Sequence, residues 1–258
     1  MQFEAVIFDI DGVLVDSPHE RAWQDTLERL MATEWRDLQS QTTYAPEAFT
    51  TAVYQQFVAG KPRLSGAQAA LEHFGIPDAA ERAVQYAARK QEMIVELIER
   101  GEFFAFDDAL RFLLAVRADG LRVAAASSSK NAHLFLRQIR LDTFAEQQGL
   151  KYDFITPGLT LLNIFDADVC GRDFEHGKPH PEIFLTAAAE AGVDPERCVV
   201  VEDAASGIQA AKAGNMAGLG VARLNDQALL EEAGADLVVT SLDDVSLDAL
   251  HEGRLERM

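Results

Sequence analysis

Two carboxylates one residue apart, Asp9 and Asp11, are the first residues of the chain whose types and spacing suggest chemistry. They follow an apolar run, residues 5–8, and precede Gly12. Asp and Gly are common where strands end, because both fit turns. However, an unbroken apolar strand is typical of a parallel sheet buried on both faces, and such sheets bind ligands beyond the carboxyl ends of their strands. The pair is therefore either a plain turn or one part of a site with partners elsewhere.

Polar residues follow a second apolar run, "LRVAAA", at residues 121–126. Ser127 comes first, and Ser128, Ser129, Lys130 and Asn131 lead into a predicted helix. Hydroxyls and backbone N–H groups at the start of a helix can bind an anion. The alternative is that the serines only cap that helix.

Two further segments complete the set of candidate residues. Lys178 in "GKPHPEIF" precedes Pro181, which fits the first turn of a helix, and "VVVED" ends in Glu202 and Asp203. Lys178 is either a solvated loop lysine or a group that neutralises a phosphate and a carboxylate together. An acidic pair after a buried strand is costly unless a cation matches it. Together with Asp9, the pair offers the hard oxygen ligands that suit Mg²⁺.

The elements that must position these residues alternate along the chain. Apolar runs at 121–127, 198–203, 217–222 and 236–240 predict strands, and the periodicity of 107–120, 181–192 and 207–214 predicts helices. This alternation indicates an α/β fold with a doubly wound, Rossmann-like parallel sheet. Residues 18–100 show only helical patterns, so we expect an α/β core of residues 1–17 and 101–258 with an inserted α-helical domain. The signals of residues 146–165 are mixed and predict no fold.

Composition restricts the class of protein. The chain has 258 residues, 48% of them hydrophobic, which supports a sizeable core. No apolar stretch approaches the roughly 18 residues of a membrane helix, and a strand is predicted within three residues of the N-terminus. We therefore expect a cytoplasmic protein, as a monomer, without a membrane partner. The two cysteines lack metal or redox spacing and are expected to be reduced.

The net charge of −19 argues against nucleic acid as a partner. An anionic small substrate would need a bound cation and local Lys or Arg to overcome the overall field.

The four segments "DIDGV", "AAAS", "GKPHPEIF" and "VVEDAASGIQAAKAG" resemble, in order and spacing, those of the haloacid dehalogenase superfamily of phosphotransferases. The resemblance covers nearly the whole chain, and residues 18–100 are similar to that superfamily's cap domain. It implies that Asp9 is the nucleophile that becomes an aspartyl phosphate and that Asp11 is the general acid and base. It further implies that Ser127 and Lys178 hold the phosphoryl oxygens. The implied ligands of Mg²⁺ are Asp9, the backbone carbonyl of Asp11, and Asp203 with Glu202 nearby.

The inserted segment is similar to the cap of β-phosphoglucomutases. The segment "HERAW", residues 19–23, is similar to the segment that follows the nucleophile of those enzymes. Arg63, at the end of "GKPR", stands where they place a cap arginine that binds the second phosphate of the substrate. Lys90 resembles a further lysine of their cap. By this resemblance His19 helps Asp11 reach its closed position. The implied substrate-binding residues are Trp23, Arg63, Lys90, Ser128, Ser129, Lys130 and Asn131. Alternatively, His19 caps a helix, Trp23 packs in a core and Arg63 is solvated.

Three functions are consistent with the sequence. The first is a Mg²⁺-dependent β-phosphoglucomutase that interconverts β-glucose 1-phosphate and glucose 6-phosphate through a bisphosphate. The second is a phosphatase of the same fold, acting on a phosphorylated sugar or another small phosphomonoester, in which water replaces the second sugar hydroxyl. The third is a non-catalytic acidic binding module that retains the fold.

Overall fold

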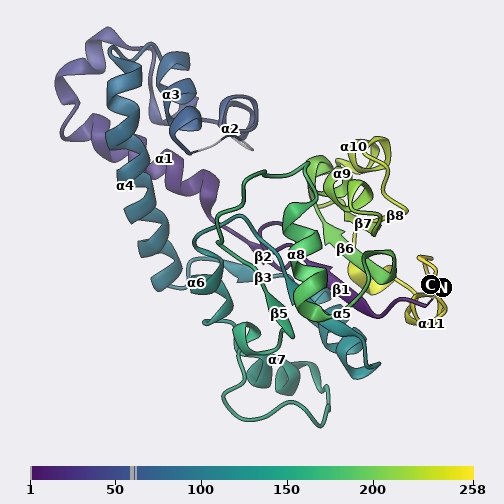
Figure 1. The fold of residues 1–258 in the computed structure, drawn as a ribbon. Helices are drawn as coiled ribbons and strands as arrows, with labels where there is room; N and C mark the ends of the chain where they lie inside the picture. Colours follow the sequence, from purple (N-terminus) through teal and green to yellow (C-terminus); the bar gives the residue numbers. More distant parts are fainter. Residues whose placement is uncertain (1, 59–60, 62) are drawn as a thin grey trace. The chain divides into compact units, whose positions relative to one another are not determined.

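The computed structural model describes residues 2–58, 61 and 63–258 (Figure 1). The chain divides into two compact units. Residues Met1–Ser17 and Phe104–Met258 form one, here called the core unit, and Pro18–Phe103 form the other, here called the cap unit.

The core unit is built on a six-stranded sheet in which every neighbouring pair of strands is parallel. The strand order is β5-β4-β1-β6-β7-β8. The bounds are β1 Ala5–Phe8, β4 Arg122–Ala125, β5 Ala167–Asp168, β6 Cys198–Glu202, β7 Ala217–Val221 and β8 Leu237–Val239. The predicted fold class is confirmed. Strand β5 was not predicted, because two residues are too short to make a recognisable apolar run.

Strand β1 lies at the centre of the sheet and is fully buried, as its unbroken apolar run predicts. Its pleat sends alternate side chains to opposite faces. Ile7 belongs to the same core cluster as Phe184 of helix α8 (Glu182–Ala191), whereas the ring of Phe8 meets that of Phe112 on helix α5 (Asp107–Ala118) edge to face at 6.2 Å. Helices thus cover both faces of β1, as a doubly wound sheet requires.

The remaining helices of the core unit connect these layers. Helix α9 (Ala205–Ala213) packs on β6 and β7, and α10 (Gln227–Glu232) packs on β7 and β8. The others are α6 Ala132–Leu136, α7 Leu141–Gln148 and α11 Leu247–His251, with 3₁₀ turns η3 Leu161–Asn163, η4 Pro195–Arg197 and η5 Leu242–Asp244.

Residues 146–165, for which no fold was predicted, form the end of α7 and a loop that returns to its start. Gly149 ends the helix in the left-handed region at φ 67°. The backbone N–H of Leu141 donates to the carbonyl of Leu159 at 3.0 Å. The carboxylate of Asp142 accepts the N–H of Gly158 at 2.7 Å, and the Arg140 guanidinium that binds it holds the pKa of Asp142 well below its usual range. Backbone pairing and the carboxylate of Asp142 therefore close this loop together.

A short antiparallel pair lies in the core unit where the chain leaves and re-enters it. Strand β2 (Val15–Asp16) pairs with β3 (Phe104–Ala105), Val15 opposite Ala105. Like β5, these strands are only two residues long and were not predicted.

The cap unit is helical throughout the residues that the structure describes there. Its helices are α1 His19–Ala32, α2 Thr51–Phe57, α3 Arg63–His73 and α4 Ala79–Glu99, with 3₁₀ turns η1 Arg36–Gln41 and η2 Pro46–Ala48. The rings of Trp23 and Tyr86 join α1 to α4 edge to face at 4.9 Å, and the Tyr86 hydroxyl donates to the Trp23 carbonyl at 2.8 Å. Among the described residues, no helix has the length and apolar content to cross a membrane.

Candidate active site

The sheet topology brings three of the predicted segments to one edge. Strands β4, β1 and β6 are neighbours and run parallel, so their carboxyl ends meet at the same edge of the sheet. Asp9 follows β1 directly, Ser127 lies two residues beyond β4, and Glu202 ends β6 with Asp203 next. The N–H of Asp9 donates to the carbonyl of Val201 at 3.1 Å, and this bond holds the end of β1 against the end of β6.

Lys178 joins this edge from the loop before α8. Its Nζ lies 2.6 Å from Oδ1 of Asp9 and 2.5 Å from Oε1 of Glu202. All three side chains are buried, with 14%, 9% and 1% of their surfaces exposed, respectively. The ammonium also lies 4.9 Å from the ring centre of Phe184, which belongs to the core beneath α8. One buried cation is thus shared between carboxylates that come from two neighbouring strands.

The site carries more carboxyl groups than Lys178 neutralises. Burial raises the pKa of Asp9 to about 7, against the lowering effect of Lys178 and with the help of Glu202 and Asp11. Burial, Glu202 and Asp9 also raise the pKa of Asp203 well above its usual range. Burial alone would lower the pKa of Lys178, but Asp9 and Glu202 outweigh that effect and raise it. The buried carboxylates therefore repel one another, and a further cation would relieve that repulsion.

Two glycines make room for the acidic side chains. Gly12 has φ +86°, and a Cβ there would lie 1.8 Å from Oδ2 of Asp203. A Cβ on Gly207 would lie 2.0 Å from Oε1 of Glu202. Carboxylates therefore lie directly against backbone at both positions, which only glycine permits.

Asp9, Glu202 and Asp203, here called the carboxylate cluster, have the chemistry of a Mg²⁺ site. Their donors are hard oxygens, and the glycines leave two of them space beside the backbone. Burial, together with repulsion between the groups, raises the pKa of Asp9 and of Asp203. A divalent cation between the carboxylates would favour their ionised forms, which also agrees with a Mg²⁺ site.

The segment after β4 contacts Asp11 through Ser127. The Ser127 hydroxyl donates to Oδ2 of Asp11 at 3.4 Å and accepts the N–H of Ser129 at 3.0 Å. Ser127 is only 2% exposed, so its hydroxyl lies inside the site. It does not cap helix α6, because that helix begins only at Ala132. The structure thus places the predicted acid and base next to the predicted phosphate ligand.

The other residues of that segment lie differently. Asn131 is buried and Ser128 is exposed. The Nζ of Lys130 is bound to the Gly171 carbonyl at 2.7 Å and to the Asp173 carboxylate at 2.6 Å. In this structure Lys130 therefore joins two loops of the core unit.

The cap unit brings together three of its four predicted residues. Lys90 of α4 is 4% exposed, and its Nζ lies 2.8 Å from Nδ1 of His19 and 5.3 Å from the ring centre of Trp23. A buried lysine with an imidazole and an indole is an unusual group for a purely structural core. Arg63 is the fourth residue; it is exposed and begins α3. Gly60 and Pro62 of the predicted "GKPR" segment lie outside the described residues.

Sequence reasoning missed an ion pair near the loop that carries Asp11. Arg223 donates to both carboxylate oxygens of Asp108, at 2.9 and 3.1 Å, and to the carbonyl of Val13 at 3.4 Å. The N–H of Leu242 also donates to Asp108 at 2.8 Å. Arg223 lies just beyond β7. A search of the residues that follow each strand, which identified Ser127 and Asp203, would therefore have identified Arg223 as well.

Comparisons with known proteins agree with this geometry. A family model of haloacid dehalogenase-like hydrolases matches residues 3–215. A β-phosphoglucomutase of Mycobacterium tuberculosis is 35% identical over 259 residues, covering 93% of this chain and 90% of that protein. A phosphorylated carbohydrates phosphatase of Thermotoga maritima is 29% identical, with 92% and 94% covered. The solved structure of an archaeal β-phosphoglucomutase from Pyrococcus superposes with a TM-score of 0.70 at 32% identity, with 95% and 96% covered.

Proposed function

The chain belongs to the haloacid dehalogenase-like hydrolase family, and within it we propose a Mg²⁺-dependent phosphotransferase that acts on a phosphorylated sugar through an aspartyl phosphate. The observation that carries this proposal is the position of Lys178, whose buried ammonium contacts Asp9 and Glu202 at once. A cation in contact with a buried carboxylate can hold the oxygens of a phosphoryl group while that carboxylate attacks phosphorus.

Asp9 and Asp11 divide the chemistry between them. A carboxylate oxygen of Asp9 attacks phosphorus, the bond between phosphorus and the sugar oxygen breaks, and Asp11 gives its proton to that oxygen. The hydroxyl of the acceptor, a sugar or water, then loses its proton to Asp11, and its oxygen attacks the phosphorus. The bond between phosphorus and the Asp9 oxygen breaks, which frees Asp9. The 3.4 Å contact with Ser127 keeps Asp11 beside the group that would bind the phosphoryl oxygens.

Asp9, Asp203 and the backbone carbonyl of Asp11 would hold Mg²⁺, with Glu202 nearby. When bound, the ion supplies positive charge that screens the phosphoryl group from the carboxylates around it. Because Glu202 is 1% exposed and accepts from Lys178 and from the N–H of Ala204, we assign it mainly to holding Lys178 in place.

The acceptor hydroxyl decides between two activities. If a sugar hydroxyl attacks the aspartyl phosphate, the enzyme is a mutase, and we propose β-phosphoglucomutase as the specific activity. Support comes from relatives that carry this name at 32–35% identity and from the contacts of the buried Lys90 with His19 and Trp23 in the cap unit. If water attacks, the enzyme is a phosphatase, as the name of the Thermotoga relative says of that protein.

One assay separates these activities. The enzyme receives β-glucose 1-phosphate, a trace of the bisphosphate and Mg²⁺, and both glucose 6-phosphate and free phosphate are measured. Isomerisation with little free phosphate supports the mutase, whereas stoichiometric free phosphate supports the phosphatase. No turnover of any compound in a panel of sugar phosphates would reject both and leave a binding module.

A further inference from the structure

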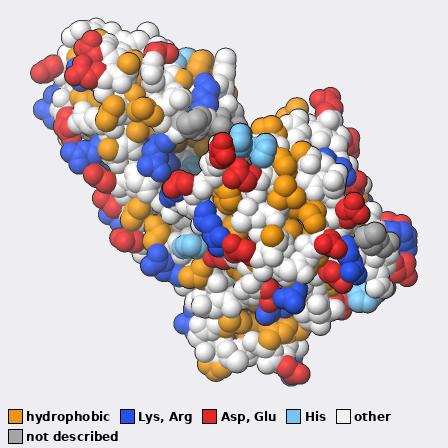
Figure 2. Space-filling view, viewed as in Figure 1, with side chains coloured by type: hydrophobic (Ala, Val, Ile, Leu, Met, Phe, Trp, Pro, Cys, Tyr) orange, Lys and Arg blue, Asp and Glu red, His pale blue; other side chains and the backbone are white. Residues whose placement is uncertain are grey.

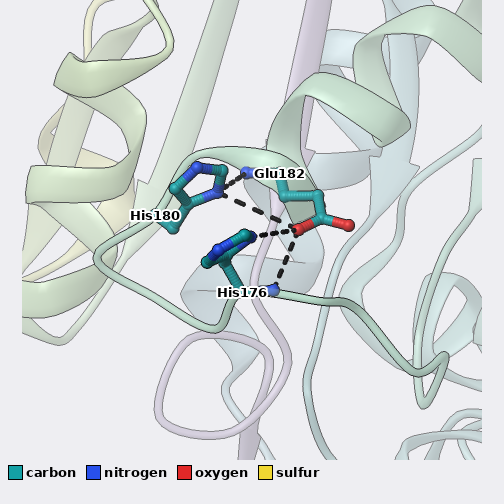
Figure 3. Close-up of side chains that lie close together, drawn as sticks. All are labelled: His176, His180 and Glu182. Atoms are coloured by element: carbon teal, nitrogen blue, oxygen red, sulfur yellow. Dashed lines mark hydrogen bonds and ion pairs between the residues drawn. The ribbon is translucent and has the colours of Figure 1, made fainter.

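Three potential metal ligands cluster outside the proposed active site. His176 and His180 lie on the loop that leads into α8, and Glu182 is the first residue of that helix. Figure 3 shows the three side chains turned toward one another. One ligand atom from each residue lies within 4.8 Å of the other two. The side chains of the histidines are 55% and 49% exposed and that of Glu182 is 31% exposed, so an ion can reach them from solvent.

The spacing is close to that of a coordinated ion. Nδ1 of His176 lies 3.5 Å and Nδ1 of His180 lies 4.0 Å from Oε2 of Glu182. Ligands about 2.0–2.2 Å from a tetrahedral Zn²⁺ stand about 3.4 Å apart. The two rings lie 4.4 Å apart between centroids. A small movement of exposed side chains therefore suffices to bring all three atoms to one ion.

Backbone contacts hold the carboxylate in position. The N–H of His176 donates to Oε2 of Glu182 at 3.0 Å (Figure 3). The N–H of Glu175 donates to Oε1 of the same carboxylate at 3.3 Å. These bonds keep the pKa of Glu182 below its usual value. The N–H of Glu182 in turn donates to Nδ1 of His180 at 3.3 Å, a long hydrogen bond that an ion bound at this nitrogen would replace.

The donor types select the class of ion. Mg²⁺ prefers oxygen ligands, whereas imidazole suits Zn²⁺, Co²⁺, Ni²⁺ and Cu²⁺. Two imidazoles and one carboxylate form a recurrent set for Zn²⁺. At the surface that Figure 2 draws, histidine side chains lie beside acidic ones, and the net charge of −19 favours any cation.

We propose that His176, His180 and Glu182 form a second cation site, distinct from the carboxylate cluster, that binds Zn²⁺ or a related transition-metal ion. The two histidines flank Lys178, each two residues away from it, and the N–H of His180 donates to the Gly177 carbonyl at 3.0 Å. An ion held by both rings ties the two ends of the segment that carries Lys178. Occupation of the site therefore restrains Lys178 on Asp9 and Glu202 and hinders the shift of its ammonium onto a phosphoryl oxygen, which lowers turnover.

Titration of Zn²⁺ into the full chain tests the site directly. An excess of Mg²⁺ is present, so that the carboxylate cluster is occupied, and heat or equilibrium dialysis reports binding. We expect one equivalent of Zn²⁺, with affinity reduced at least about tenfold by His176→Gln or His180→Gln, since even the loss of an outer partner of a metal ligand costs that much. His251→Gln, at an exposed position at the end of α11, is the matched control and should bind as the wild type does.

A spectroscopic measurement makes the test independent of activity. Co²⁺ bound by two imidazoles and a carboxylate should give visible absorption bands in the wild type and the His251→Gln variant that the other two variants lose. Equal Zn²⁺ binding by all variants, or no binding by the wild type, would overturn the proposal.

The effect on turnover rests on the proposed function and is tested separately. Added Zn²⁺ should lower turnover of a phosphate ester by the wild type but not by His180→Gln, and equal inhibition of both would refute the link to Lys178. An enzyme without turnover would refute the proposed function, while the binding data would still decide whether the site exists.

Discussion

The Nζ of Lys178 lies 2.6 Å from Oδ1 of Asp9, across 169 positions of sequence. The same ammonium contacts Glu202, so one buried cation links the end of β1 to the end of β6. Such a group serves stability and chemistry together. Removal of one partner from a buried ion pair costs far more than removal of an exposed one, because the other charge remains buried.

Lys178→Met should therefore weaken the fold as well as abolish turnover. We expect a loss of about 3–5 kcal/mol in the free energy of unfolding without Mg²⁺, measured by urea denaturation. The double variant Lys178→Met/Glu202→Gln should recover part of that loss, because it removes one of the two stranded carboxylates. Unchanged stability of the single variant would mean that the two carboxyl groups do not depend on Lys178.

Gly12→Ala should disable the site by displacing Asp203. Its Cβ would lie 1.8 Å from Oδ2 of Asp203, and φ at Gly12 is +86°. Gly120 has the same φ, with nothing within 4 Å of an added Cβ, so Gly120→Ala is the matched control. Backbone strain should cost each variant about 1–2 kcal/mol of stability, and Gly12→Ala should lose more because its Cβ also displaces Asp203. Only Gly12→Ala should lose turnover and Mg²⁺ affinity; equal turnover by the two would argue against Asp203 as a ligand.

The pair of Asp108 and Arg223 should make stability depend on pH. Burial acts to raise the pKa of Asp108, but hydrogen bonds from Arg223 and Leu242 prevail, so the folded pKa lies below the ordinary value of 3.8. The stabilisation is therefore present above that value and lost as pH falls through the lower, folded pKa. Wild type should be more stable than Asp108→Asn by a few kcal/mol at neutral pH, and the difference should shrink in strong acid.

Urea denaturation across that range checks the pH dependence. Arg111→Gln is the control, because its partner Asp243 is 44% exposed and such pairs contribute about 0–1 kcal/mol. A constant difference between wild type and Asp108→Asn at all pH values would contradict the assignment.

Because Arg223 also donates to the Val13 carbonyl, Arg223→Gln should lower turnover through the loop that carries Asp11.

Arg63 provides a test of substrate choice. If it binds the second phosphate of a bisphosphate, Arg63→Ala should reduce the mutase reaction by tenfold or more, on the order of one lost charge-assisted hydrogen bond, yet spare hydrolysis of a small aryl phosphate. Arg29→Ala, at another exposed arginine of the cap unit, should affect neither reaction. Equal losses in the two reactions of Arg63→Ala would show that Arg63 does not distinguish the substrates.

The sequence predicted the parts of the site that depend on strand ends. Asp9, Ser127 and Asp203 each follow an apolar run, and a parallel sheet brings such positions to one edge. The contact of Lys178 with both Asp9 and Glu202 could not be predicted from the sequence, because no local pattern specifies which carboxylates a loop lysine contacts. The same is true of Gly12, where a Cβ would clash with Asp203, a residue distant in sequence.

The elements that escaped prediction have weak local signals. Strand β5 is two residues long, and the loop after α7 is closed by backbone pairing and by the carboxylate of Asp142. The pair of Asp108 and Arg223 joins residues 115 positions apart. In each case the stabilising contact, through backbone pairing for β5 and through side chains for the other two, joins segments that only the fold brings together, and periodicity does not report it.

The most direct test of the account is to identify the residue that carries the phosphoryl group during turnover. Wild-type enzyme is mixed with a phosphorylated sugar and Mg²⁺, quenched in acid and reduced with borohydride, which converts an aspartyl phosphate to homoserine. Peptide mass spectrometry should find homoserine at position 9 in the wild type and none in an inactive but folded Asp9→Asn variant. Modification at another residue, or turnover by Asp9→Asn, would contradict the assignment of Asp9 as the nucleophile.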